Sequence, residues 1–349
     1  MEQKILIIGG YGAVGSQIAA YLAPLYPDRV IIAGRNLDKA QSKADELSYG
    51  IKALAFDLSD FQDESILEDI KMVIVCLDSN HTKLVEACIR RGIVYLDISA
   101  RYETLKQIEA LESLARSCKS TVILSVGLAP GLTNLLAQQA YNKLLCTQSI
   151  DIFILLGLGE KHGKQAYRWT FNHIDHFYKV RNIPIKSFTQ PLKTELSGLR
   201  NFYTFDFSDQ HVLSSLLPNV VVKTRMSFDL NWFTRLTALL RSVGFTRIFR
   251  NKKVQDVAIS GLNNWSIGTD LFGVKVIAKN NNSETQTYTF LGHNESKVTA
   301  AFTTEVAYQT LTAENLPYGV LHSHTLIHDI PRFIKRLKSY DNSFCFSKP

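Results

Sequence analysis

The sequence predicts an α/β fold in two parts: an N-terminal doubly wound parallel sheet, followed by an α+β domain with a mainly antiparallel sheet. Three features carry this prediction. Short apolar runs alternate with helical segments through the first 130 residues, a glycine-rich turn joins the first run to the first helix, and strand-like runs from residue 150 onward lack regular helices between them. The 349 residues also exceed what one hydrophobic core usually holds, which favours two domains.

The first element is an apolar run at residues 4–8, whose β-branched residues are typical of a buried parallel strand. Glycines at 10, 12 and 15 follow it at the G-x-G-x-x-G spacing, and residues 16–22 read as a helix. In that motif the first glycine allows the tight turn, the second lets the backbone approach a pyrophosphate, and the third lets helix and strand pack closely. The pyrophosphate lies at the helix N-terminus, where free N–H groups favour an anion. The turn predicts a Rossmann-type nucleotide site, with a merely structural turn as the alternative; the contacting residues would be Gly10, Tyr11, Gly12, Ala13, Val14 and Gly15.

The second strand, at residues 29–33, ends in Gly34, Arg35 and Asn36. Domains that prefer NAD usually place Asp or Glu about 20 residues beyond the glycines, where it binds the ribose 2′-hydroxyl. No acid stands at this strand end, and Arg35 can instead bind a 2′-phosphate, with Asn36 adding a further hydrogen bond. We therefore expect NADP as the cofactor, with NAD less favoured. The alternative is that Arg35 is an ordinary surface arginine.

Four more strands follow in the same rhythm of strand and helix, at residues 52–57, 72–77, 94–98 and 120–126. This alternation predicts right-handed crossovers and a parallel sheet covered by helices on both faces. Ligands bind such sheets beyond the carboxyl ends of the strands. We expect Asp57 to lie where the adenine binds, and the other predicted cofactor contacts on this rim are Cys76, Leu77, Asp78 and Gly127.

Residues 127–137, with the sequence G-L-A-P-G-L-T-N-L-L-A, resemble the G-x-D-P-G-x-x-N-L-L-A segment of the saccharopine dehydrogenase-like family. That family includes saccharopine reductase and carboxynorspermidine dehydrogenase. Three further segments agree and occur in the expected order: G-G-Y-G-A-V-G at residues 9–15, Y-L-D at 95–97, and S-K-V-T-A at 296–300 before Gly319 and Val320. The resemblance spans nearly the whole chain and implies an NAD(P)-dependent oxidoreductase.

The resemblance also implies that the chain leaves the nucleotide domain near Pro130, builds a second domain, and returns with a helix at residues 296–313. We expect the first domain at residues 1–130, completed by residues 296–349, and a substrate and dimerisation domain at residues 131–295. The sequence agrees, because strand-like runs occur at residues 150–156, 219–228, 254–260, 272–278 and 285–291. In the family the second sheet carries the substrate side and pairs subunits, which implies a homodimer.

One position departs from the family pattern. Ala129 stands where family members commonly have an acid before the Pro-Gly pair. That acid lies beside the substrate in saccharopine-type enzymes, so its absence argues against saccharopine as the substrate.

Hydride transfer requires a protein that positions nicotinamide against substrate and excludes water, usually with a proton donor or a charged group added. Asp97 and Tyr95, at the end of the fifth strand, are catalytic candidates on the predicted rim. His162 is a third, in the glycine-bounded segment 157–164, whose histidine and two lysines suit an anionic substrate. That segment reads equally as an ordinary solvated loop.

These features predict an NADP-dependent oxidoreductase of the saccharopine dehydrogenase-like type, acting on a small anionic or carrier-linked metabolite. One alternative is a trans-acting enoyl reductase, because some members of the family reduce double bonds on polyketide intermediates. Another, motivated by Ala129, is a protein that binds NADPH without turnover, as a sensor or scaffold.

The composition bears on cellular location, membrane insertion, metal binding and nucleic-acid binding. The five cysteines are scattered, odd in number and without a C-x-x-C pair, as in a cytoplasmic protein with reduced thiols. No stretch approaches the length of a membrane span, and the apolar N-terminal run reads as part of the fold rather than as a signal peptide. We expect no metal site, because the histidine groups His173/His176 and His322/His324/His328 bring no cysteines and no H-E-x-x-H pattern is present. The net charge of +7 comes with no nucleic-acid-binding motif, so we expect no such partner.

Residues 223–253 are unusually basic, with eight Lys or Arg against a single acid, Asp229. Within them an apolar stripe at helical spacing is formed by Trp232, Phe233, Leu236, Leu239, Leu240 and Val243. Such a stripe usually packs on the protein itself or on a second subunit, and we expect that here. The alternative is a weak contact of residues 228–253 with an anionic membrane or a carrier protein.

Overall fold

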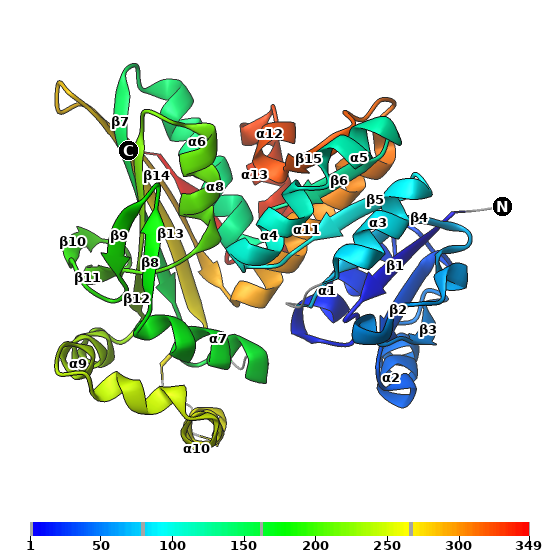
Figure 1. Cartoon of the computed structure of the whole chain (residues 1–349), viewed down its shortest axis with the longest axis horizontal. Helices are drawn as coiled ribbons and strands as arrows, with labels where there is room; N and C mark the ends of the chain where they lie inside the picture. The colour runs from blue at the N-terminus through cyan, green and yellow to red at the C-terminus, as the bar shows by residue number, and fades with distance from the viewer. Residues whose placement is uncertain (1–2, 78–80, 161–162, 265–267, 349) are drawn as a thin grey trace. The chain divides into compact units, whose positions relative to one another are not determined.

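The computed structural model of the chain describes residues 3–77, 81–160, 163–264 and 268–348. The chain divides into two compact units, which we describe separately (Figure 1). Unit 1 comprises Met1–Leu132 and Ser296–Tyr340, and unit 2 comprises Thr133–Glu295 and Asp341–Pro349. The sequence had placed residues 341–349 in the first domain. That assignment is wrong, because the strand β16 (Cys345–Ser347) pairs with a strand of the second sheet.

Unit 1 is built on a seven-stranded sheet in which every pair of neighbouring strands runs parallel, in the order β15-β6-β5-β4-β1-β2-β3. The strands are β1 (Lys4–Ile8), β2 (Val30–Gly34), β3 (Lys52–Ala55), β4 (Ile70–Val75), β5 (Val94–Asp97), β6 (Thr121–Leu124) and β15 (Gly319–His322). The prediction of a doubly wound parallel sheet is confirmed. Only β15, a four-residue strand contributed by the returning chain, was not predicted.

The helices of unit 1 are α1 (Ala13–Leu22), α2 (Leu37–Leu47), α3 (Thr82–Arg90), α4 (Tyr102–Glu109), α5 (Glu112–Ser117), α11 (Glu295–Thr312), α12 (Ser323–Leu326) and α13 (Ile330–Tyr340). Shorter turns are η1 (Leu58–Asp60), η2 (Glu64–Leu67) and η3 (Leu128–Leu132). The central strands β1 and β4 are almost entirely buried, as their continuous apolar runs predict. The strand order reverses between them, which marks the place where ligands bind in sheets of this kind.

Unit 2 contains a second seven-stranded sheet, in the order β10-β11-β12-β7-β13-β14-β16, and a separate hairpin formed by β8 and β9 (Figure 1). The strands β7 and β12 run parallel, and the other neighbours are antiparallel. Its strands are β7 (Thr147–Leu156), β8 (Phe177–Val180), β9 (Ile183–Lys186), β10 (Leu192–Glu195), β11 (Leu199–Thr204), β12 (Val221–Phe228), β13 (Leu271–Asn280), β14 (Thr285–His293) and β16. The mainly antiparallel second sheet is therefore confirmed.

The helices of unit 2 are α6 (Thr133–Lys143), α7 (Lys164–Ile174), α8 (Ser208–Leu216), α9 (Asn231–Ser242) and α10 (Lys252–Asn264), with the 3₁₀ turn η4 (Phe245–Arg250) between the last two. The strand predicted at residues 254–260 is wrong, since this segment forms the middle of α10. Gln255 and Ile259 are buried, whereas Val257 between them is 74% exposed. Burial four residues apart follows the period of a helix. The β-branched valines of the segment had suggested a strand.

A buried carboxyl group lies in the first turn of α8. Asp209 is fully buried, and its Oδ1 accepts hydrogen bonds from the Thr224 hydroxyl and the Gln210 amide, both at 2.7 Å. Burial raises the pKa of Asp209 to about 6, although its hydrogen bonds from Thr224, Thr133 and Gln210 oppose the shift. The folded state therefore holds the proton more tightly than the unfolded chain.

This shift predicts a pH-dependent contribution to the stability of unit 2. The pKa of Asp209 is higher in the folded state than in the unfolded chain. The stabilisation that protonated Asp209 provides is therefore complete below about pH 4 and is lost as the pH rises through about 6. Two pKa units correspond to about 3 kcal/mol. Relative to wild type, Asp209→Asn should therefore gain about this much unfolding free energy between about pH 4 and pH 7.

The measurement is urea denaturation followed by tryptophan fluorescence, because all three tryptophans fall within the range of unit 2. If the difference in unfolding free energy between wild type and variant stays constant across this pH range, the prediction is contradicted.

Candidate cofactor-binding site

Close packing in the turn between β1 and α1 explains why two of its residues are glycines. A Cβ at Gly15 would lie 2.4 Å from the Gly9 carbonyl oxygen, and one at Gly10 would lie 2.6 Å from the Ile32 Cβ. The sequence assigned helix packing to Gly15, which agrees with this contact, and the tight turn to Gly10. The left-handed conformation falls instead on Gly9, with φ of +81°. Gly10 is required by the close approach of β2.

Gly12 has no such structural reason to be a glycine. Its backbone is extended, with φ of −75° and ψ of 174°, which any residue adopts. Its missing Cβ would contact only the Gly9 carbonyl oxygen, at 3.2 Å. Gly12 is also the N-cap of α1, and no side chain caps this helix end. The open space therefore lies in front of uncapped N–H groups, as a bound pyrophosphate requires.

The end of β2 adjoins this turn. A Cβ at Gly34 would lie 2.3 Å from Cε1 of Tyr11, so the tyrosine ring covers this strand end. Arg35 follows directly and is exposed. The Asn36 side chain caps α2, since its Oδ1 accepts from the Lys39 amide at 2.8 Å. Its NH₂ group is thus the part that could serve a phosphate.

Asp57 lies just beyond β3 and is exposed to solvent. Its Oδ1 accepts hydrogen bonds from the Ser59 hydroxyl at 2.7 Å and from the Ser59 amide at 3.0 Å. These two bonds lower the pKa of Asp57, and the positive charge of Arg35 adds to the effect. The structure therefore brings Arg35 and Asp57 within electrostatic reach of each other, as their places on the predicted rim require.

The ends of β1 and β4 also meet. The Cys76 amide donates to the Ile8 carbonyl oxygen at 2.8 Å, and a Cβ at Gly9 would lie 3.0 Å from Leu77 Cδ2. Burial raises the pKa of the Cys76 thiol, followed by the charge of Asp97. Gly127 follows β6, and its carbonyl oxygen accepts from the Leu132 amide at 2.8 Å. Ala13 and Val14 open α1.

A buried network joins the start of α3 to the end of β5. His81 Nε2 lies 2.7 Å from Asp97 Oδ2, and the Tyr95 hydroxyl donates to the same oxygen at 2.8 Å. The Ser99 amide donates to Asp97 Oδ1 at 2.6 Å. Burial raises the pKa of Tyr95 well above its usual value, and the charge of Asp97 adds to it. Asp97 and Tyr95 are both fully buried. Their contacts with the rest of the site pass through His81 and the neighbouring backbone.

Sequence reasoning missed His81. The available signal was its position: a histidine at the N-cap of α3, in the loop that follows the fourth strand. The predicted site residues Asp78 and His162 lie outside the described residues. Whether Asp97, Tyr95 and His162 take part in catalysis stays a prediction.

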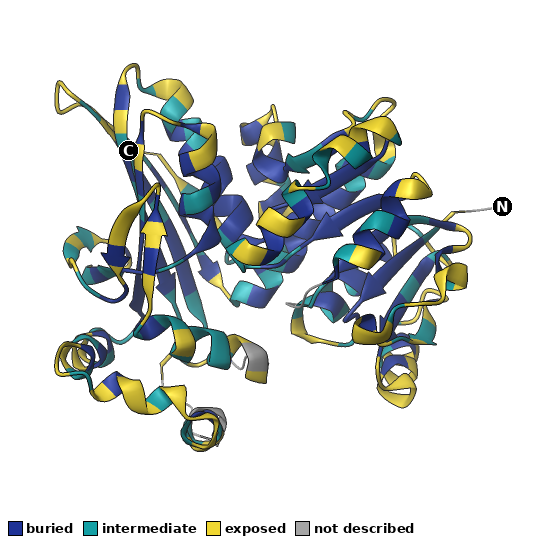
Figure 2. Ribbon diagram, viewed as in Figure 1, coloured by how far each residue is buried: buried dark blue, intermediate teal, exposed yellow. Residues whose placement is uncertain are grey.

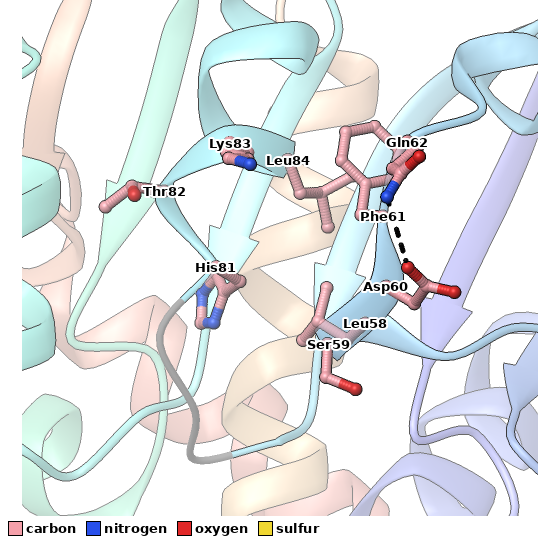
Figure 3. Close-up of a pocket in the computed structure, with 9 residues that line it drawn as sticks. All are labelled: Leu58, Ser59, Asp60, Phe61, Gln62, His81, Thr82, Lys83 and Leu84. Atoms are coloured by element: carbon pink, nitrogen blue, oxygen red, sulfur yellow. Dashed lines mark hydrogen bonds between the residues drawn. The ribbon is translucent and has the colours of Figure 1, made fainter.

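A pocket of about 320 Å³ opens beside this network. One side is formed by the turn that follows Asp57, and the other by the start of α3 with His81 (Figure 3). Its lining residues are Leu58, Ser59, Asp60, Phe61, Gln62, His81, Thr82, Lys83 and Leu84. Apolar side chains of Leu58, Phe61 and Leu84 stand beside polar groups, which is the composition of a small-molecule site.

In the part of the chain that the structure describes, no group of three or more His, Cys, Asp or Glu side chains is placed to hold a metal ion. Within the same residues, no helix is long and apolar enough to cross a membrane.

Comparison with known proteins agrees with this geometry. Residues 5–123, about a third of the chain, match the family model of the saccharopine dehydrogenase NADP-binding domain. No curated protein matches the sequence. Among solved structures, the apo form of saccharopine dehydrogenase (L-Glu forming) from Saccharomyces cerevisiae is similar with a TM-score of 0.69 and 15% identity, covering 99% of this chain and 100% of that chain. A meso-dapdh variant with DAP from Clostridium tetani E88 covers 95% of this chain and 98% of that chain, with a TM-score of 0.46 and 13% identity.

At 15% identity, the yeast structure shows the fold and not the activity. The fold is that of a saccharopine dehydrogenase-like NAD(P)-binding oxidoreductase, and the matched domain is one that binds a nicotinamide cofactor. The resemblance read from the sequence is thus confirmed: residues 5–123 match the saccharopine dehydrogenase NADP-binding domain, and the chain has the fold of saccharopine dehydrogenase.

Proposed function

We propose that the protein is an NADP-dependent oxidoreductase acting on a small anionic or carrier-linked metabolite. The observation that carries the cofactor preference is the end of β2, which presents the exposed Arg35 and no acid beside the turn of Gly12. The match of residues 5–123 to an NADP-binding domain supports the binding of a nicotinamide cofactor.

Unit 1 offers a place for each part of the cofactor. The N-terminus of α1 at Gly12 would bind the pyrophosphate, Arg35 and the Asn36 amide the 2′-phosphate, and the pocket beyond Asp57 the adenine. When bound, the nicotinamide accepts or donates a hydride. The protein contributes binding, orientation and exclusion of water.

The buried network would hold this site in shape. Asp97 and Tyr95 fix His81, which lines the pocket on one side and reaches the end of β5 on the other. In this proposal, His81 is the member that faces ligand, and Asp97 and Tyr95 are positioning residues.

An excess of positive charge in unit 2 supports an anionic substrate. At the start of α7, Lys164 and Arg168 both contact Asp256, at 2.9 and 2.8 Å. One carboxylate shared by two cations leaves one positive charge uncompensated at this end of α7. Ala129, in place of the family's acid, favours a substrate other than saccharopine.

The cofactor preference is tested by Arg35→Ala. A charge-assisted hydrogen bond contributes about 1.5–3 kcal/mol, so at about 1.4 kcal/mol per tenfold the variant should bind NADPH one to two orders of magnitude more weakly. Removing Arg35 also leaves the negative charge of Asp57 to repel a phosphate. NADH binding should stay nearly unchanged, since NADH lacks the 2′-phosphate.

Fluorescence titrations of both cofactors on both proteins make the measurement. Arg90→Ala is the matched control, because this exposed arginine ends α3 and so lies at the opposite edge of the sheet. A wild-type protein that prefers NADH, or an Arg35 variant that loses both cofactors equally, would show that Arg35 is only a surface residue.

The reaction itself is tested by NADPH oxidation with two groups of candidate substrates, keto acids paired with amines and enoyl thioesters. Turnover with the first group supports the proposal, and turnover confined to thioesters supports the trans-acting enoyl reductase. Tight NADPH binding without turnover on either group would support the sensor or scaffold.

We further propose a homodimer formed through unit 2 and a location in the cytoplasm. The dimer is supported by the family resemblance, and the location by five cysteines that all remain free thiols.

A further inference from the structure

The helix α9 is amphipathic in the direction opposite to that of an ordinary surface helix. Its inward face is polar: Thr234 and Arg241 are 1% and 2% exposed. Its apolar stripe faces outward, with Trp232 59% and Leu239 60% exposed. The stripe was expected to pack on the protein itself or on a second subunit; packing on its own chain is wrong for most of its residues, and packing on a second subunit stays a prediction. Phe233 and Leu240 are the exceptions, since both are partly buried, and the Phe233 ring packs edge-on against Phe228 at 5.3 Å.

Buried hydrogen bonds hold the polar inward face, which explains why α9 lies this way round. The Thr234 hydroxyl accepts from the Phe228 amide at 3.0 Å, and Arg241 donates to the Ser187 carbonyl oxygen at 2.9 Å. Arg241 also contacts Asp175 at 3.2 Å. Turning the apolar stripe inward would break these buried bonds, so the outward stripe is a fixed property of the fold.

The exposed apolar surface continues beyond α9. We define the apolar face as Trp232, Leu236, Leu239, Val243, Phe245 and Ile248, all of them exposed. The first four recur at helical spacing along α9, and the last two are three apart in the 3₁₀ turn η4, which contacts α9. Exposed segments run along α9 and α10 in Figure 2. An exposed apolar surface of this kind marks a site of interaction.

Positive charge is concentrated in the elements that form the apolar face and at the start of α10. Arg247 and Arg250 are exposed and approach the same carboxylate as Arg241, that of Asp175, at 3.9 and 3.1 Å. Three guanidinium groups therefore share one negative charge, which leaves a local excess of two. The exposed side chains of Arg235, Lys252 and Lys253 add three more cations.

We propose that this face docks unit 2 on an anionic lipid bilayer. Exposed tryptophan and leucine side chains can enter the boundary between headgroups and acyl chains, while the arginines and lysines meet the lipid phosphates. A second copy of the chain fits less well. A symmetric dimer places the same patch of both subunits together, and here it would oppose two uncompensated positive clusters.

The test is flotation of the full chain with vesicles of phosphatidylcholine alone, or of an equimolar mixture of phosphatidylcholine and phosphatidylglycerol. Wild type should float with the mixed vesicles and not with the neutral ones, and binding should fall as salt is added. Each cation near an anionic surface strengthens binding about fivefold. The triple variant Arg235→Gln, Lys252→Gln, Lys253→Gln should therefore bind about a hundredfold more weakly.

The apolar contribution is tested by Trp232→Ser combined with Leu239→Ser, which should reduce binding more than tenfold. Leu145→Ser is its matched control, because Leu145 is an exposed leucine elsewhere in unit 2 and should not matter. Lys335→Gln with Lys338→Gln is the control for charge, since both lysines are exposed on unit 1.

Two results would overturn the proposal. One is failure of wild type to float with mixed vesicles at low salt. The other is a wild-type dimer in sedimentation velocity that Trp232→Ser with Leu239→Ser converts to monomer, because a second subunit would then cover the face. The proposed cofactor preference is measured separately by the titrations on Arg35, so either proposal can fail alone.

Discussion

Replacing Gly12 by valine is expected to remove NADPH binding while unit 1 stays folded. The backbone of Gly12 is in a conformation that valine adopts readily, and only one protein atom lies near the position of its Cβ. The added side chain would fill the space in front of the α1 N-terminus. Losing two charge-assisted hydrogen bonds of about 1.5–3 kcal/mol each should lower the affinity for NADPH by at least two orders of magnitude.

The measurement pairs isothermal titration with NADPH and a thermal melt followed by circular dichroism. Gly15→Val is the contrasting variant, since its Cβ would lie 2.4 Å from the Gly9 carbonyl oxygen and 2.8 Å from the Gly10 Cα. That variant should lose stability as well as binding. A folded Gly12→Val protein with unchanged NADPH affinity would remove the cofactor site from this turn.

Asp97→Ala should cause the largest loss of stability in unit 1. Asp97 Oδ2 is bonded by both His81 Nε2 and the Tyr95 hydroxyl, all three side chains being buried. Removing one partner of a buried charged network costs about 3–5 kcal/mol. Tyr95→Phe deletes a single hydrogen bond and should cost about 0.5–1.5 kcal/mol.

Urea denaturation followed by circular dichroism detects both units, whereas tryptophan fluorescence detects unit 2 alone, since no tryptophan falls within unit 1. The dichroism midpoint should fall in Asp97→Ala, and the fluorescence midpoint should remain. Equal dichroism midpoints for wild type and Asp97→Ala would show that the network contributes little to the fold.

The first unit could be predicted from the sequence because its signals are local. Buried parallel strands are continuous apolar runs, and the glycine turn is read from seven consecutive residues, 9–15. The same local reading misplaced the tight turn at Gly10, because spacing alone does not say which glycine has positive φ.

The rest of the site depends on contacts that spacing cannot give. His81 lies 16 residues before Asp97 in the sequence, and only the pairing of β4 with β5 brings them to a hydrogen bond. The segment at residues 254–260 has the composition of a strand, but it forms a helix that buries Gln255 and Ile259 on one face. Similarly, the apolar stripe that includes Trp232 has the spacing of a buried helix face. The stripe faces solvent because the opposite face of the helix makes the buried hydrogen bonds of Thr234 and Arg241.

The central claim is that NADP binds at the N-terminus of α1, with its 2′-phosphate at the end of β2. A crystal structure of the protein with NADPH tests this most directly. The account predicts electron density for the pyrophosphate against the backbone at Gly12 and for the 2′-phosphate within hydrogen-bonding distance of Arg35. Cofactor density elsewhere on the protein, or none at saturating NADPH, would contradict it.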